Sequence, residues 1–350
     1  MDRMPLEIQT LYAELMERLS ALEAGRSIGH VPGSFVTKAV KGDTYYYFQY
    51  FDPGGSKRQI YIGRKDKILE EVVKKYREER ASLAEEEAGI QRLCTLLRAG
   101  GALLNDSASA RVLKALSDAG IFRLGAVLIG TQAFLVLGNL LGVRWTGGSI
   151  RTQDIDIAAE ASLSLAIPDL RTNIPDVLEG LQMGFLPVPP LDPRKPSTSF
   201  KVRGKGLRLD LLTPLRGRQR QGPVFITRLN AAARPLSFLD FLITRPVRGA
   251  VIDGGGILVN LPDPARLAFH KLIVSAERET VMHTKREKDL HQAAQLFSIL
   301  AEERPGDIRM VLEEIHLKGK GWVKRIREGL SALKKMDPTV AEKMTPFLSR

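Results

Sequence analysis

Two aspartates separated by one residue stand in the apolar segment Asp154-Ile-Asp156-Ile157. In a β-strand, residues two apart point to the same side, so both carboxylates would project together while Ile155 and Ile157 face the core. Two neighbouring carboxylates repel each other unless a cation lies between them, and Mg²⁺ or Mn²⁺ prefers such oxygen ligands. A solvent-facing edge strand with alternating aspartates is the alternative interpretation.

A third aspartate, Asp210, lies within the apolar run 207–212, which also has strand character. A carboxylate in such a run is costly to bury without a partner. Beside the strand of Asp154 and Asp156, it would complete a site of three acids for metal ions. It could instead lie at the exposed end of its strand, paired with Arg208.

An apolar strand over 126–129 runs into Gly130-Thr131 and then into a helix. Glycine lets a phosphate approach the backbone, threonine offers a hydroxyl, and the start of a helix offers unpaired N–H groups. The same pattern fits an ordinary structural turn.

Together these three pieces resemble the polymerase-β-like nucleotidyltransferase superfamily. The Thr-x-Asp-x-Asp spelling at 152–156 is similar to its minimal branches, which include abortive-infection and toxin-type transferases. The downstream helices, with Lys271, Arg278 and Lys288-Asp289, resemble the same branches. The resemblance covers about 124–296. It departs from the family pattern at Thr131, where Ser or Gly is usual, and in the long, proline-rich segment between the second and third acids.

The resemblance implies a metal-dependent enzyme that moves a nucleoside monophosphate from a nucleoside triphosphate to an acceptor hydroxyl. Asp154 and Asp156 would hold two Mg²⁺ or Mn²⁺ ions. Asp210 would hold the catalytic ion and receive the acceptor proton.

The triphosphate would have its own ligands. Gly130 and Thr131 would cradle its distal phosphates, and Thr152 is a further candidate for nucleotide binding. Arg151 and Lys271 are the cationic candidates, although Lys271 fits a solvated helix face equally well.

The 350-residue chain carries 52 lysines and arginines against 40 acids, a net charge of +12. This excess favours polyanionic partners, although a solvated basic surface also explains it. We therefore expect RNA, including transfer RNA, as the acceptor, with a protein or small molecule as alternatives and a toxin or defence role allowed. A catalytically inactive nucleic-acid-binding protein with the same fold is the second hypothesis. The oligomeric state is left open.

The single cysteine, Cys94, excludes an intramolecular disulfide and fits a reducing, cytoplasmic compartment. The charge-free segment 124–143 is long enough to cross a bilayer. Its glycines and its polar residues Gln132 and Asn139 favour a buried strand, turn and helix instead, so no membrane contact is expected.

The order of elements predicts an α+β protein with a mixed-sheet nucleotidyltransferase core. Residues 1–105 would form an N-terminal helix, a small antiparallel β-meander (34–40, 45–51, 59–62) and a long charged helix. Residues 106–260 would form the catalytic core and 261–350 a helical domain.

Two basic segments could contact nucleic acid. Five of the seven tyrosines lie between Tyr45 and Tyr61 among lysines and arginines, where they could stack bases or, as we favour, form the core of the small sheet. Arg216-Gly-Arg-Gln-Arg220 could be a phosphate-binding loop or a solvated turn.

Overall fold

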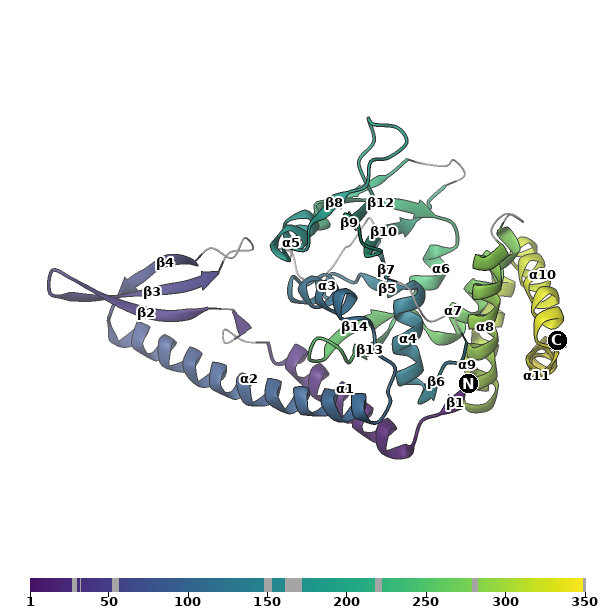
Figure 1. Cartoon of the computed structure of the whole chain (residues 1–350), viewed down its shortest axis with the longest axis horizontal. Coiled ribbons are helices and arrows are strands. Elements are labelled where there is room, and N and C mark those ends of the chain that lie inside the picture. The colour runs from purple at the N-terminus through teal and green to yellow at the C-terminus, as the bar shows by residue number, and fades with distance from the viewer. Residues whose placement is uncertain are drawn as a thin grey trace.

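The computed structural model of the chain describes residues 1–26, 30–31, 33–51, 57–147, 153–160, 172–217, 222–278 and 283–348. It has a mixed α+β fold with a central sheet and helices packed against it (Figure 1). In the described part of the chain, no helix is both long and apolar enough to cross a membrane. Arg151, Thr152, Arg218 and Arg220 lie outside the described residues.

The central sheet is mixed, and its strand order is β11-β12-β10-β7-β5. Strands β7, β10 and β12 run parallel, whereas β5 is antiparallel to β7 and β11 is antiparallel to β12. Two further strands, β8 and β9, extend the sheet from the first half of β10. The strands are β5 (Val127–Ile129), β7 (Asp154–Ala158), β8 (Phe185–Pro187), β9 (Ser199–Val202), β10 (Arg208–Pro214), β11 (Val224–Ile226) and β12 (Ala231–Leu236).

Apolar residues that alternate along these strands anchor the sheet in one large core. Helix α4 (Gly130–Leu140), which follows β5 directly, is buried along most of its length, as the sequence predicted for this charge-free segment. A β-hairpin of β13 (Val247–Val251) and β14 (Ile257–Leu261) lies beside β5 and α4. The smaller helices are α3 (Ser107–Asp118), α5 (Ile174–Gly180) and α6 (Leu239–Ile243), and Thr227–Leu229 form a 3₁₀ turn.

The C-terminal helices pack into the same core. The ring of Phe269 in α7 meets that of Phe297 in α8 edge to face, with 4.9 Å between centroids. The Asp263 carboxylate caps α7 by accepting hydrogen bonds from the N–H groups of the next turn. These helices are α7 (Pro264–Glu277), α8 (His283–Glu303), α9 (Pro305–Leu317), α10 (Lys320–Met336) and α11 (Pro338–Leu348).

The N-terminal helix α1 (Leu6–Ala24) lies alongside the second half of α2 (Lys67–Ala99) (Figure 1). Their apolar faces form a second core with the β13 strand. Within it, the Tyr12 hydroxyl donates to the carbonyl of Ala250 and accepts from its N–H. The short strand β1 (Asp2–Arg3) pairs with β6 (Val143–Arg144). The division of the chain at residues 105 and 260 stays a prediction.

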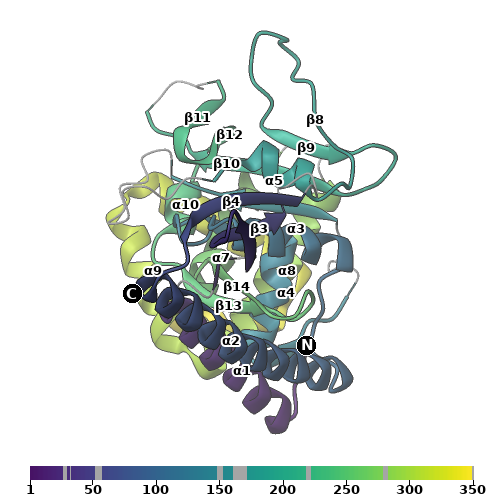
Figure 2. The ribbon, with the colours of Figure 1, turned by 90° about the vertical axis from the view of Figure 1, so that its left-hand side faces the viewer.

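Strands β2 (Ser34–Val40), β3 (Asp43–Phe51) and β4 (Lys57–Arg64) form the antiparallel meander that the sequence predicted. We call these strands and the first half of α2 the arm. The arm stands apart from the rest of the molecule in Figure 1, and in Figure 2 the arm faces the viewer.

Candidate active site

The parallel pairing of β7 with β10 brings the predicted acids together. In its register, Asp210 lies beside Asp156 and Arg208 beside Asp154. Ile155 and Ile157 are fully buried, so the acids occupy the other face of the sheet. Asp210 is buried, Asp156 is partly buried and Asp154 is exposed. The structure therefore gathers these three residues on one face of two neighbouring strands.

Asp210 already has partners on its own and the neighbouring strand. Its Oδ1 atom accepts a hydrogen bond from Arg208 Nε at 2.9 Å and a short one from the Ser199 hydroxyl. Arg208 Nη2 also donates to Ser199 Oγ at 3.0 Å. The pairing with Arg208 that the sequence allowed is thus present, although Asp210 is buried and does not lie at an exposed strand end.

The negative charge of Asp156 is disfavoured by its surroundings. Burial, and then the negative charges of Asp210 and Asp154, raise its pKa from 3.8 to about 6. The positive charges of Arg234 and Lys271 act in the opposite direction. A cation bound among the three acids would offset their mutual repulsion and so lower the pKa of Asp156.

Gly130 lies against the Asp156 carboxylate. Its φ of +71° is a backbone conformation that side chains disfavour, and a Cβ at this position would collide with Asp156 Oδ2. Thr131 follows it as a buried residue in the first turn of α4. The Gly-Thr turn therefore brings the start of this helix directly to the acids.

Lys271 in α7 faces the acids from the C-terminal part of the chain. It is buried, and its Nζ lies 3.0 Å from Asp289 Oδ1 in α8, so the solvated-face interpretation is wrong. Arg278 Nε bonds the other oxygen of Asp289 at 2.8 Å. Burial opposes the charge on Asp289, yet Lys271 and Arg278 hold its pKa below its usual value.

Lys288 and Arg234 also belong to this surface. Burial and the charge of Lys271 lower the pKa of Lys288, whereas the negative charges of Asp154 and Asp156 raise it. The Lys288 amine therefore lies close enough to these two acids to interact with them electrostatically. Arg234 lies on β12, whose residues 231–236 were not predicted as a strand. The only sequence signal for Arg234 is that it is a lone arginine in an alanine-rich run. Pro235 next to it disfavours a strand at that position.

The donor chemistry of the three acids fits a hard divalent cation, because carboxylate oxygens are its usual ligands. In the present arrangement, no group of three or more acidic, histidine or cysteine side chains within the described ranges could hold a metal ion. The Asp210 carboxylate is instead bound to Ser199 and Arg208. A metal ion would thus compete with the Arg208 guanidinium for this carboxylate.

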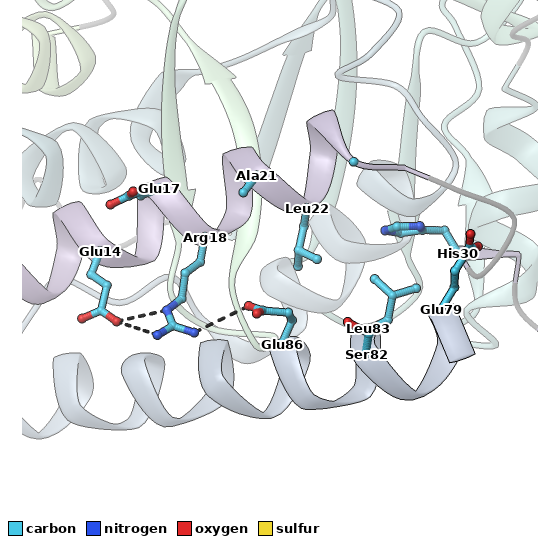
Figure 3. Close-up of a pocket in the computed structure, with 11 residues that line it drawn as sticks. Glu14, Glu17, Arg18, Ala21, Leu22, His30, Glu79, Ser82, Leu83 and Glu86 are labelled. Atoms are coloured by element: carbon cyan, nitrogen blue, oxygen red, sulfur yellow. Dashed lines mark hydrogen bonds and ion pairs between the residues drawn. The ribbon is translucent and has the colours of Figure 1, made fainter. Parts of the chain in front are cut away.

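A cavity of about 760 Å³ lies away from these acids, between α1 and α2 (Figure 3). Four glutamates line it, and Arg18 forms ion pairs with two of them, Glu14 at 2.9 Å and Glu86 at 3.5 Å. An acidic lining disfavours a triphosphate. The acids on β7 and β10 remain the candidate site for nucleotide chemistry.

The mixed sheet, the acids on its parallel strands and the glycine turn are features of an enzyme that transfers phosphate-containing groups. Residues 107–316, more than half of the chain, match a family model described as nucleotidyltransferase. The chain therefore belongs to this nucleotidyltransferase family.

Two other comparisons add little. A solved structure of an antigenic nucleotidyltransferase-like protein from Paracoccidioides brasiliensis is similar, with 11% identity over 68% of this chain and 93% of that chain. The TM-score between the two structures is 0.36. No curated protein matches the sequence.

Proposed function

We propose that the chain transfers a nucleoside monophosphate from a nucleoside triphosphate to an acceptor hydroxyl, with Asp154, Asp156 and Asp210 as its catalytic acids. The observation that carries the proposal is the register that puts Asp210 beside Asp156, whose pKa is raised to about 6 by burial and by the two other acids. Such a concentration of negative charge is costly unless cations neutralise it.

Asp154, Asp156 and Asp210 would hold two Mg²⁺ or Mn²⁺ ions, and this chemistry would activate the acceptor hydroxyl and neutralise the pyrophosphate that leaves. Asp210 would exchange Arg208 for the catalytic ion. Once released, Arg208 would be a cation beside Asp154 that can approach the triphosphate. Ser199 would keep the Asp210 carboxylate oriented through their hydrogen bond.

The nucleotide would lie along the start of α4 and the surface of Lys271. Gly130 lets the backbone at the start of α4 lie directly against the Asp156 carboxylate, and the first N–H groups of the helix can bind a phosphate. Lys271 contributes positive charge, and its ion pair with Asp289, with 3.0 Å between Nζ and Oδ1, fixes its position. Arg151 and Thr152 belong to the proposed nucleotide site through the sequence resemblance alone.

RNA is the acceptor that we favour, with a protein as the alternative, because the chain has a net charge of +12. A role as an abortive-infection or toxin-type transferase follows from the sequence resemblance and belongs to the same proposal. A cytoplasmic location agrees with the single Cys94, whose thiol is buried.

The test is to incubate the protein with each α-labelled nucleoside triphosphate, Mg²⁺ or Mn²⁺, and total cellular RNA or protein. We expect label in the RNA fraction, which EDTA and the Asp156→Asn substitution both abolish. Asp118→Asn, which removes an exposed carboxylate elsewhere, is the matched control. Label in protein would change the acceptor, and no label with any nucleotide would favour an inactive nucleic-acid-binding protein.

A further inference from the structure

The two faces of the arm sheet have different surroundings. On the face toward α2, the rings of Phe35, Phe48 and Tyr76 meet edge to face, with centroids 5.1 to 5.7 Å apart. Tyr46 is buried on the same face. These four aromatic residues are the core that the small sheet needs.

The opposite face carries a second set of aromatic residues, Tyr45, Tyr47 and Tyr61, which we call the tyrosine row. The Tyr61 ring lies 6.0 Å from that of Tyr45 and 5.6 Å from that of Tyr47. Tyr61 is 55% exposed, and the other two are partly exposed. Because the face toward α2 already supplies a core, the tyrosine row is left with ring surface that water can reach.

Basic side chains flank the tyrosine row. Lys38 Nζ lies 4.6 Å from the centre of the Tyr47 ring, and Lys38 and Arg64 both pair with Tyr45 in the register. The Arg64 side chain is 67% exposed, and its partner Asp43 is the single acid in the three strands. The face therefore combines a positive charge with ring surfaces, which a polyanion with planar groups would complement.

We propose that the tyrosine row, with Lys38 and Arg64, binds single-stranded nucleic acid. Bases would stack on the rings, and phosphates would contact the lysine and the arginine. Base pairs of a duplex stack on one another and keep their faces from the tyrosines, so a single strand fits this surface better. RNA as the strand rests on the proposed function, whereas the stacking surface itself does not.

The stacking mechanism sets the size of the effects. Loss of one ring under a base weakens binding about tenfold. Each phosphate contact contributes about −0.7 to the slope of log affinity against log salt concentration. Removal of Lys38 should therefore make the slope less negative, whereas removal of a tyrosine should lower affinity at every salt concentration.

The experiment measures fluorescence anisotropy of dye-labelled oligouridylate, oligodeoxythymidylate and a duplex of equal length with the full chain in EDTA. We expect the single strands to bind more tightly than the duplex. Tyr61→Ala should weaken that binding about tenfold, whereas Tyr61→Phe, which keeps the ring, should stay near wild type. Lys38→Ala should reduce the salt slope, and Lys74→Ala on the solvated face of α2 should not. Tighter binding of the RNA oligomer would support RNA as the strand.

A second readout does not depend on a truncated side chain. Tyr61→Trp places a fluorophore in the row, and stacking of a base on it should quench the added emission relative to wild type. Equal binding of strands and duplex by wild type, with no change in Tyr61→Ala and no quenching in Tyr61→Trp, would overturn the inference.

The outcomes separate this inference from the proposed function. Tyrosine-dependent binding without nucleotide transfer would leave the stacking surface intact and remove the proposed reaction. Nucleotide transfer that Asp156→Asn abolishes, together with binding that Tyr61→Ala leaves unchanged, would support the proposed reaction and remove the stacking surface.

Discussion

Arg208 and Asp210 lie two residues apart on β10, and the Nε atom of the arginine donates a hydrogen bond to Oδ1 of the aspartate at 2.9 Å. The same stretch of strand pairs with Asp154 and Asp156. The guanidinium thus neutralises Asp210, one of the three clustered acids. In the proposed mechanism, a metal ion binds to this same carboxylate. Competition between an arginine and a divalent cation for one carboxylate can be measured.

Arg208→Gln should lower the melting temperature in EDTA, because Asp210 loses its counter-ion. The expected loss is about 1–3 kcal/mol. Mg²⁺ or Mn²⁺ should then raise the melting temperature more in the variant than in wild type, since no guanidinium competes with the ion. Arg194→Gln, at a side chain that is 92% exposed and pairs with Asp192, is the control. An equal response to metal in wild type and Arg208→Gln would show that Arg208 does not compete.

Asp156→Asn should abolish transfer and stabilise the metal-free protein at pH 7. The pKa of Asp156 is raised from 3.8 to about 6, so the folded state holds this proton more tightly than the unfolded chain. Its contribution to stability is therefore present at low pH and is lost as the pH rises from about 4 to about 6. Asparagine avoids that loss, which is on the order of 3 kcal/mol.

The measurement is a melting curve in EDTA at a series of pH values. The advantage of Asp156→Asn should be complete above pH 6 and absent below pH 4, where aspartic acid is protonated in both states. Asp118→Asn, at a side chain that is 57% exposed, is the control. If Asp156→Asn is no more stable than wild type at pH 7, burial and the neighbouring acids do not destabilise the Asp156 carboxylate.

The local parts of the site could be predicted from the sequence. Asp154 and Asp156 were expected on one face of a strand, and both lie on β7. Turn residues, side-chain alternation and β-branched residues are local signals, and they were sufficient for this strand and for the three strands of the arm. The register between β7 and β10 could be expected only from the shared need of their acids for a cation.

The long-range parts could not be predicted. The ion pair of Lys271 with Asp289 depends on the packing of α7 against α8, and helical periodicity alone does not say which neighbour a lysine meets. Arg234 was missed because a short, alanine-rich strand that contains Pro235 has little strand propensity of its own. In the arm, both interpretations of the tyrosine cluster depended on which face packs against α2.

Gly130→Ala should abolish transfer and destabilise the fold. The φ of +71° disfavours any side chain, and the new Cβ would also collide with the Asp156 carboxylate. Gly204→Ala is the matched control, because Gly204 has a φ of +73° and, among the described residues, no neighbouring atom within 4 Å of the point that a Cβ would occupy. Both variants should lose about 1–2 kcal/mol from backbone strain. A loss of transfer in Gly204→Ala as well would show that strain, not the contact with Asp156, is responsible.

Lys271→Met should destabilise the protein by about 3 kcal/mol, because it leaves the buried Asp289 with Arg278 as its remaining charged partner among those described. Adding Asp289→Asn should recover part of that loss, since the uncompensated carboxylate is then absent. The double-mutant cycle measures their coupling in urea titrations. Lys74→Met, at a side chain that is 77% exposed, should change stability by less than about 0.5 kcal/mol. Additive effects of the two substitutions would contradict the pairing.

Two divisions of the N-terminal region predict different truncation results. A boundary near residue 105 predicts that residues 106–350 melt cooperatively by themselves. The second core, however, joins α1 and the second half of α2 to Ala250 and Ile252 of the hairpin region, so that truncation would expose an apolar surface. We therefore expect residues 106–350 to melt at a lower temperature or to aggregate.

Removal of the arm alone should be tolerated. Gly25 at the end of α1 and Leu83 within α2 line the same cavity, so a short glycine–serine linker can replace residues 27–82 and keep both helix segments in the second core. Melting followed by circular dichroism should give a transition within a few degrees of wild type, since the arm contributes little to either main core. The arm-deleted chain should retain metal-dependent stabilisation while losing tight binding of oligouridylate. If it unfolds while residues 106–350 melt cooperatively, the boundary near residue 105 is the correct one.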